Sequence, residues 1–316
     1  MESKTLISPT PSAISQMYSE LGTTETKVDL DVKFLKEWMR KQPHLPNPDD
    51  CEKIIDEKRI KMFLLMCKNS LEKTKTMLDQ HYTIKNSIPE YYSDWDPTSP
   101  EIINAMKLYS IAPLPNPTHE GHRVGLYCAR TKEDDTFVFN DLAKLSLMSM
   151  DLRMAKLDTF KKIVYIFDLN YFSMNLVTEM LSNIKKFLGT SSAAYPTRIH
   201  EVHIVNMKSY IQPLVNIIMS VTKNKFSHRL IIHKSVDDLK NSIDPSILPL
   251  NYGGTYPKTS NEIIDDWYDE LVKHREWLMT QSTIVADDSK RPKNSKNNLV
   301  NFENAMEGSF RKLGVD

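Results

Sequence analysis

Between residues 124 and 234 the sequence alternates short apolar runs with longer segments of helical spacing. The apolar runs are VGLYCA, KIVYIFDL, HEVHIVN and HRLIIH, and the helical segments between them lie near 140–160, 174–188 and 212–224. Such alternation is typical of βαβ units, in which helices connect parallel strands. The sequence therefore predicts an α/β fold with a mostly parallel sheet.

The region before this alternation shows helical spacing alone. Phe34, Leu35 and Trp38 form one apolar set and Ile60, Phe63 and Leu64 form another, which predicts a small helical bundle. The proline-marked segment YYSDWDPTSPE is a linker out of this bundle, and both chain ends are polar. We expect a flexible N-terminus over 1–27, a helical domain over 28–92, an α/β domain over 93–257, a C-terminal helix over 258–281 and a flexible tail over 282–316.

Charge and cysteine content narrow the class of protein. The 316 residues carry 41 Lys and Arg against 41 Asp and Glu, so the whole chain has no net charge that would attract nucleic acid. Cys51, Cys67 and Cys128 are widely spaced, which indicates free thiols in a reducing compartment. The N-terminus lacks an apolar leader, and no run approaches the roughly 18 to 20 apolar residues of a membrane span. We expect a cytoplasmic protein.

The strand-to-helix turns show no catalytic motif. A GxSxG elbow, a phosphate-binding GxxxxGK[ST] loop and a dinucleotide-binding GxGxxG loop are all missing, and the His200 and His203 pair lacks a third metal ligand nearby. Asp168 follows the strand YIFDL, where it is either a general base or a residue that orders the turn. Because a partner nucleophile is missing, we favour the turn and expect no enzyme, no metal and no cofactor.

The helix near 212–224 has one apolar face and lies in a basic region. Periodicity alone favours packing of this face on the sheet. From residue 198 to 234 the only acid is Glu201, against six basic residues: Arg198, Lys208, Lys223, Lys225, Arg229 and Lys234. Such a region attracts anionic lipid headgroups or nucleic acid, but no nucleic-acid-binding motif accompanies it.

Several segments, in order, resemble the CRAL-TRIO family of lipid-binding proteins. They are FLLMCKNSLEKTKTMLDQHYTIKNSIPEYY, IVYIFDL, YPTRIHEVHIVNMKSYIQPLVNIIMSV and HRLIIHKSVDDLKNSIDPSILPLNYGG, spanning about 29 to 275. The ending LPLNYGG is similar to the family's LPxEYGG, with Asn251 in place of the acid. The nearest group in the family holds the alpha-tocopherol transfer protein and the cellular retinaldehyde-binding protein. In this chain, the Gly253–Gly254 pair at the end of LPLNYGG predicts a turn that closes the domain.

The resemblance implies a lipid pocket between a sheet floor and a mobile gate helix. Carried over by position, the residues implied to line it are Ser146, Met150, Ile163, Tyr165, Phe167, Phe187, Ile211, Leu214, Val215 and Ile218. Met150 stands where the tocopherol protein has a second serine. For the strand, period-2 alternation independently places Ile163, Tyr165 and Phe167 on one face.

The resemblance also implies a phosphoinositide site. Its matching positions are Arg198, His200, Lys225 and Arg229. Several departures from the family pattern accompany it: MSV at 219–221 replaces KPF, Leu65 and Cys67 replace two arginines, and Asn170 replaces a glycine. The first two changes imply altered membrane docking or headgroup exchange, and Asn170 must form the turn after the strand differently.

Two functions follow from the resemblance. The first is a monomeric cytosolic carrier of one hydrophobic ligand, such as a retinoid, tocopherol or carotenoid, which exchanges it during transient contact with phosphoinositide-containing membranes. The second is an adaptor that holds a lipid and signals to a partner protein without transporting the lipid. A hydrolase that uses Asp168 is the least favoured alternative, and nucleic acid is not an expected partner.

Overall fold

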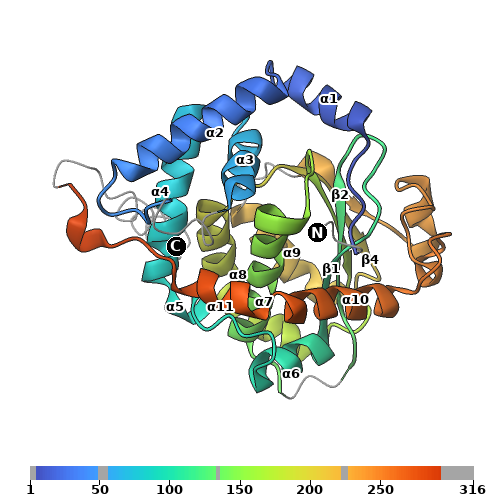
Figure 1. The fold of residues 1–316 in the computed structure, drawn as a ribbon. Coiled ribbons are helices and arrows are strands. Elements are labelled where there is room, and N and C mark those ends of the chain that lie inside the picture. The colour runs from blue at the N-terminus through green and yellow to red at the C-terminus, as the bar shows by residue number, and fades with distance from the viewer. Residues whose placement is uncertain (1–4, 49–55, 133–135, 222–226, 293–316) are drawn as a thin grey trace, which may run out of the picture.

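The computed structural model of the chain describes residues 5–48, 56–132, 136–221 and 227–292. A helical region leads into one five-stranded sheet, and two further helices close the described part of the chain (Figure 1). None of the described helices is both long enough and apolar enough to span a bilayer.

The N-terminal region is helical, as the spacing predicts. Its helices are α1 (Pro11–Glu20), α2 (Glu25–Arg40), α3 (Glu57–Met66), α4 (Leu71–Ser87), α5 (Pro89–Tyr92) and α6 (Pro100–Leu108). Side-chain caps start several of them, as where the Thr24 hydroxyl accepts a hydrogen bond from the Lys27 amide. In α2 the buried face includes Val32 and Leu35, whereas Phe34, which the pattern grouped with Leu35, is exposed.

The five strands lie in the sheet in their order along the chain. They are β1 (Tyr109–Pro113), β2 (Arg123–Ala129), β3 (Ile163–Asp168), β4 (Ile199–Val205) and β5 (Leu230–Ile232). β1 pairs with β2 antiparallel, and the remaining pairs are parallel. This arrangement confirms the predicted mostly parallel sheet.

Helices connect the parallel strands: α7 (Phe139–Leu152) joins β2 to β3, α8 (Met174–Ala194) joins β3 to β4, and α9 (Gln212–Val221) leads toward β5. A π-helical turn, η1 (Arg153–Leu157), extends α7. Because crossovers are right-handed, strands in sequential order bring all three helices to one face, here called the inner face. The helical region packs beyond them, and its side chains share one hydrophobic core with those of the inner face.

A smaller core covers the opposite, outer face of the sheet. Val124, Val164 and Ile166 point into it from the strands. It is closed by the segment after β5, which includes the 3₁₀ turns η4 (Val236–Asn241) and η5 (Leu250–Tyr252), seen at the right of Figure 1. The two faces are therefore covered differently, with long helices on one and short turns on the other.

Helices α10 (Ser260–Lys273) and α11 (Arg275–Thr283) replace the single predicted C-terminal helix. They run from the sheet edge toward α5 (Figure 1). The Trp267 indole N–H donates to the Ser149 hydroxyl at 2.9 Å, and the Tyr268 hydroxyl donates to the Tyr109 carbonyl oxygen. These bonds fix α10 against α7 and β1.

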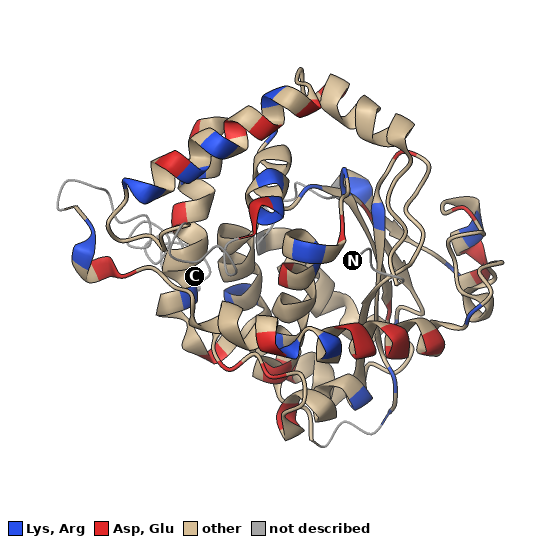
Figure 2. Ribbon diagram, in the orientation of Figure 1, with Lys and Arg blue, Asp and Glu red and all other residues tan. Residues whose placement is uncertain are grey.

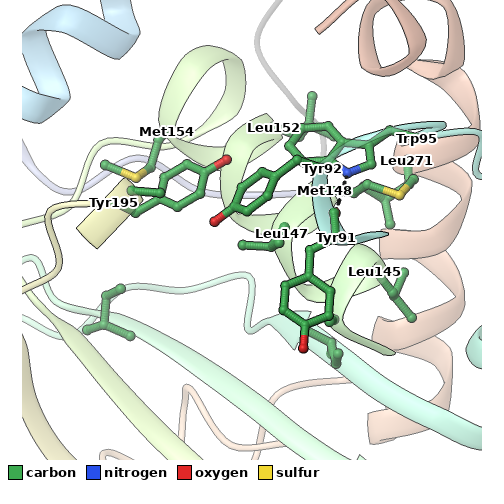
Figure 3. Packing of buried hydrophobic residues seen from close by; sticks show 14 of the residues in the cluster. Tyr91, Tyr92, Trp95, Leu145, Leu147, Met148, Leu152, Met154, Tyr195 and Leu271 are labelled. Carbon is green, nitrogen blue, oxygen red and sulfur yellow. Dashed lines mark hydrogen bonds between the residues drawn. The ribbon is translucent and has the colours of Figure 1, made fainter. Parts of the chain in front are cut away.

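Aromatic side chains and a buried ion pair join the helical region to the α/β domain. Figure 3 shows Tyr91, Tyr92 and Trp95 packed among the α7 residues Leu145, Leu147, Met148 and Leu152. On α3, the Arg59 Nη2 atom lies 2.6 Å from Asp151 Oδ2, and both side chains are fully buried. Asp151 also accepts a hydrogen bond from the Tyr195 hydroxyl at 3.1 Å. The two regions are thus held together by a charged contact within an apolar core.

The chain ends depart from the predicted flexible segments. Within 5–27, α1 is a well-capped helix, Leu6 and Met17 are buried, and the Ile7 amide donates to the Pro115 carbonyl oxygen at 3.0 Å. Within 282–292, the Ala286 amide donates to the Tyr82 carbonyl oxygen at 3.0 Å. A polar composition suggested disorder, but a few apolar side chains and backbone hydrogen bonds suffice to dock both segments.

The glycine pair makes the predicted turn. Gly253 ends η5 with φ of 71°, a left-handed conformation that favours glycine. At Gly254 an added Cβ would lie 1.8 Å from the Leu248 carbonyl oxygen, so no side chain fits there. Asn251, which stands where the family has an acid, accepts a hydrogen bond from the Ser260 amide at 2.8 Å and so secures the start of α10.

Substituting Gly254→Ala should lower the free energy of unfolding by about 3 kcal/mol, because backbone must shift to admit the methyl group. Gly22→Ala is the matched control: its φ is also positive, at 63°, but no atom lies within 4 Å of an added Cβ. It should cost about 1 kcal/mol, the conformational term alone. Chemical denaturation of both variants measures the difference, and equal losses would contradict the close approach at Gly254.

Candidate lipid-binding site

The inner face of β3 carries the strand residues that the sequence predicts for the pocket. Ile163, Tyr165 and Phe167 belong to the larger core, while Val164 and Ile166 between them belong to the outer core. Ile163 is fully buried, whereas Tyr165 and Phe167 are only half-buried. The period-2 assignment of these side chains to one face is therefore correct.

Tyr127 on β2 joins Tyr165 and Phe167 in an aromatic floor. The ring centroid of Tyr127 lies 5.4 Å from that of Tyr165 and 5.2 Å from that of Phe167. Gly125 makes room for this cluster, because a Cβ there would lie 3.2 Å from the Tyr127 ring. Sequence reasoning missed Tyr127, although it alternates with Val124 and Leu126 in the same way as the β3 residues do.

The α7 and α8 candidates stand around this floor. Ser146 and Met150 on α7 are half-buried, and the Ser146 hydroxyl donates to the Leu142 carbonyl oxygen at 2.8 Å. Phe187 on α8 is also half-buried, with its ring centroid 6.0 Å from Tyr91 and 5.9 Å from Phe139. Phe187 therefore lies against α5 and α7, toward the helical region.

The predicted gate helix is α9, and its apolar face points inward. Ile211, just before the helix, and Leu214 and Val215 within it are buried, and Ile218 is half-buried. The exposed positions Gln212, Asn216 and Ser220 follow the opposite face. Nine of the ten candidate pocket residues thus belong to or pack against the inner-face core, and the tenth, Ser146, is half-buried on α7.

Asp168, at the end of β3, holds three segments together. Its Oδ1 atom accepts hydrogen bonds from the Asn170 amide at 3.0 Å and the Asn206 side chain at 2.8 Å. Its Oδ2 atom accepts one from the Tyr252 hydroxyl at 2.7 Å. The carboxylate therefore orders the turns after β3 and β4 and ties them to the LPLNYGG segment, in agreement with the structural role that the sequence favoured.

A basic cluster, defined here as Lys162, Arg198, His200 and Arg229, forms where β3 and β4 begin. Burial, then the charge of Arg198, lowers the pKa of Lys162, and Arg229 adds to this effect. The Arg229 Nη1 atom also donates to the Ile199 carbonyl oxygen at 2.6 Å, which anchors it to β4. Lys and Arg gather at this upper end of the sheet in Figure 2, while Asp and Glu follow α10 at the other.

Sequence reasoning missed Lys162, although the pair KK directly before the strand IVYIF was a usable signal. The predicted Lys225 lies outside the described residues. Leu65 and Cys67, which replace family arginines, are buried in the core around α3 and bring no charge to the cluster. The fold thus adds Lys162 to the cluster, a basic side chain that the family pattern did not include.

The ring of His200 in the cluster lies against that of His122, with centroids 4.3 Å apart and the ring planes tilted by 46°. Burial, then the nearby His200 and Lys162, lowers the pKa of His122 to about 4. Burial likewise lowers the pKa of His200. Both rings are therefore neutral at pH 7, and the positive charge of the cluster rests on its lysine and arginines. Among the described residues, no group of three or more His, Cys, Asp and Glu side chains could hold a metal ion.

Two family models match the chain. Residues 108–254 match the CRAL/TRIO domain, and residues 24–102 match the Pinta-like UBA domain. The first covers the sheet from its first strand to the glycine pair, and the second covers α2 to α5.

Individual proteins are also similar to this chain. Clavesin-1 of Rattus norvegicus is 22% identical over 250 residues, 78% of this chain and 69% of the relative. Clavesin-2 of Mus musculus is 22% identical over 202 residues, 61% of this chain, and the match spans 62% of the relative, a little under two thirds. The crystal structure of Sfh5 superposes with a TM-score of 0.49 at 10% identity, over 85% of this chain and 99% of the other.

The match of the sheet region to the CRAL/TRIO domain confirms the resemblance seen in the sequence. The structure agrees, with a helical region followed by an α/β domain and a mostly parallel sheet. The chain therefore carries a CRAL/TRIO domain over residues 108–254, the domain that defines the CRAL-TRIO family of lipid-binding proteins.

Proposed function

We propose that the protein is a carrier that holds one hydrophobic ligand on the inner face of the sheet and exchanges it at anionic membranes. The observation that carries this proposal is the set of half-buried apolar side chains in the middle of the fold. Tyr165 and Phe167 on the floor, Met150 on α7 and Ile218 on α9 all keep accessible surface there. Cores of monomeric proteins are normally close-packed, so we infer that a further apolar group covers these side chains when the ligand is bound.

The ligand must be released by a change in the protein. Burial of about 400 Å² of apolar surface at ~25 cal/mol/Å² contributes on the order of 10 kcal/mol before the cost of ordering. Spontaneous escape into water is then slow. Helix α9 is the element suited to open, because it is short, packs through one apolar face and can exchange that contact for acyl chains at a bilayer.

The basic cluster supplies the membrane contact. Each Lys or Arg near an anionic surface contributes roughly 1 kcal/mol, and phosphoinositides present the highest charge for one headgroup. Arg229 follows α9 in the chain, and we propose that headgroup binding there influences the position of α9. We therefore propose that a monomer in the cytosol docks transiently on phosphoinositide-containing membranes and has no catalytic role.

Ligand transfer between liposomes tests the proposal. Donor liposomes loaded with retinol or α-tocopherol should lose the ligand to acceptors when the protein is added, about tenfold faster when the acceptors contain phosphatidylinositol bisphosphate. Fluorescence of the transferred ligand measures the rate. The proposal fails if neither ligand moves faster than in the absence of protein, and stable ligand binding without transfer would favour the adaptor instead.

The double substitution Lys162→Gln and Arg198→Gln should weaken binding to bisphosphate-containing liposomes about thirtyfold, since two charges at roughly 1 kcal/mol each are removed. Lys240→Gln is the control, because this exposed lysine lies in η4 on the outer face. Liposome sedimentation measures binding, and mass spectrometry measures the ligand retained. Unchanged sedimentation would contradict the docking role, and loss of retained ligand together with binding would show that the cluster is structural.

A further inference from the structure

Two tyrosine hydroxyls occur in the aromatic floor of the site, where the family resemblance assigns only an apolar surface. Tyr127 and Tyr165 stand on neighbouring strands, edge to face, with ring centroids 5.4 Å apart. Both belong to central strands of the sheet, beneath the crossover helices. Their position raises the question of what their hydroxyls bind.

Other deeply placed tyrosines in the molecule have clear partners. The Tyr195, Tyr252 and Tyr268 hydroxyls donate to Asp151, to Asp168 and to the Tyr109 carbonyl oxygen, respectively. By contrast, the hydroxyls of Tyr127 and Tyr165 make no hydrogen bond to any residue in the described part of the chain. Buried hydroxyls usually find a partner, so the lack of one at both residues calls for an explanation.

These two hydroxyls also differ from the other unpaired phenols. The Tyr82 and Tyr92 hydroxyls lack partners but are sealed within the core, whereas those of Tyr127 and Tyr165 retain accessible surface on half-buried side chains. Both rings nevertheless pack within the aromatic floor, and this burial raises the pKa of both hydroxyls. Both side chains stand on the inner face of the sheet, where the proposed ligand would lie. They remain protonated at neutral pH and can act as hydrogen-bond donors.

A buried excess of positive charge lies at the start of β2, the strand that carries Tyr127. Arg123 and Arg153, both buried, share the single carboxylate of Asp158, at 2.7 Å and 3.3 Å. One acid for two guanidiniums leaves a net positive charge, which buried sites normally compensate. The charge of Arg153 reaches both tyrosines, where it opposes the effect of burial on their pKa. The local potential therefore favours an electron-rich group on the floor.

We propose that Tyr127 and Tyr165 bind the polar end of the ligand, and that the ligand is a lipid with an acceptor oxygen at its buried end: a carboxylate, carbonyl or hydroxyl. This inference rests on the proposed lipid-carrier function and narrows its ligand class. A pure hydrocarbon would leave both hydroxyls and the excess charge without a partner, so the site disfavours it. The acceptor end then lies on the sheet, and the apolar remainder extends under α8 and α9.

Competition between three 16-carbon probes tests this assignment. Delipidated full-length protein is incubated with liposomes that contain equal amounts of palmitic acid, hexadecan-1-ol and hexadecane, then re-isolated, and the retained probes are quantified by mass spectrometry. We expect the acid and the alcohol to be retained at least about tenfold over the hydrocarbon. The Tyr127→Phe and Tyr165→Phe double variant should lose most of this preference without losing hexadecane.

The matched control is Tyr171→Phe, which removes the hydroxyl of an exposed tyrosine in the turn after β3 and should keep the wild-type preference. Because the floor hydroxyls make no bond to the described protein, the double variant should melt at the wild-type temperature when delipidated. Equal retention of all three probes by the wild type, or an unchanged preference in the folded double variant, would overturn the assignment. Retention of no probe at all would instead contradict the carrier function itself, and the inference with it.

Discussion

The order of the strands is the constraint on which the remaining architecture depends. Because β2 to β5 lie in sequence order and run parallel, right-handed crossovers return every connecting helix to the same face. That face is covered by long helices, and the other is closed by short turns and a small core. The half-buried aromatic side chains collect on the inner face, where helices stand over the strands and can leave space between them.

Buried charges hold this arrangement in place. The Arg123 side chain, fully buried, donates to the carbonyl oxygens of Ile7, Leu114 and Pro115 and to the carboxylate of Asp158. It thereby fastens the N-terminal segment, the start of β2 and the end of η1 to one point. Breaking a buried pair costs far more than a surface pair, because the remaining charge is left without water. Polar contacts thus hold the elements around the candidate site, whereas α9 packs on the core through apolar side chains.

Periodicity predicted much of the fold, and the family resemblance predicted most of the candidate site. The alternation along KIVYIFDL assigned Tyr165 and Phe167 to one face, and the spacing from Ile211 to Ile218 assigned the inner face of α9. Composition misled at both ends of the chain, because Leu6 and Met17 are too few to stand out among Ser and Thr but are enough to dock on an existing surface. Tyr127 and Lys162 were missed because neither belongs to the pattern carried over from the family.

The sequence by itself determined the class of each element and the face on which its side chains lie, because both depend on neighbours a few residues away. Only the tertiary structure decided which side chains meet. Lys162 lies beside Arg198, and Tyr127 beside Tyr165, because parallel pairing brings the starts and centres of separate strands together. The two hydroxyls on the floor likewise lack a partner only because the fold places them where no other described polar group reaches.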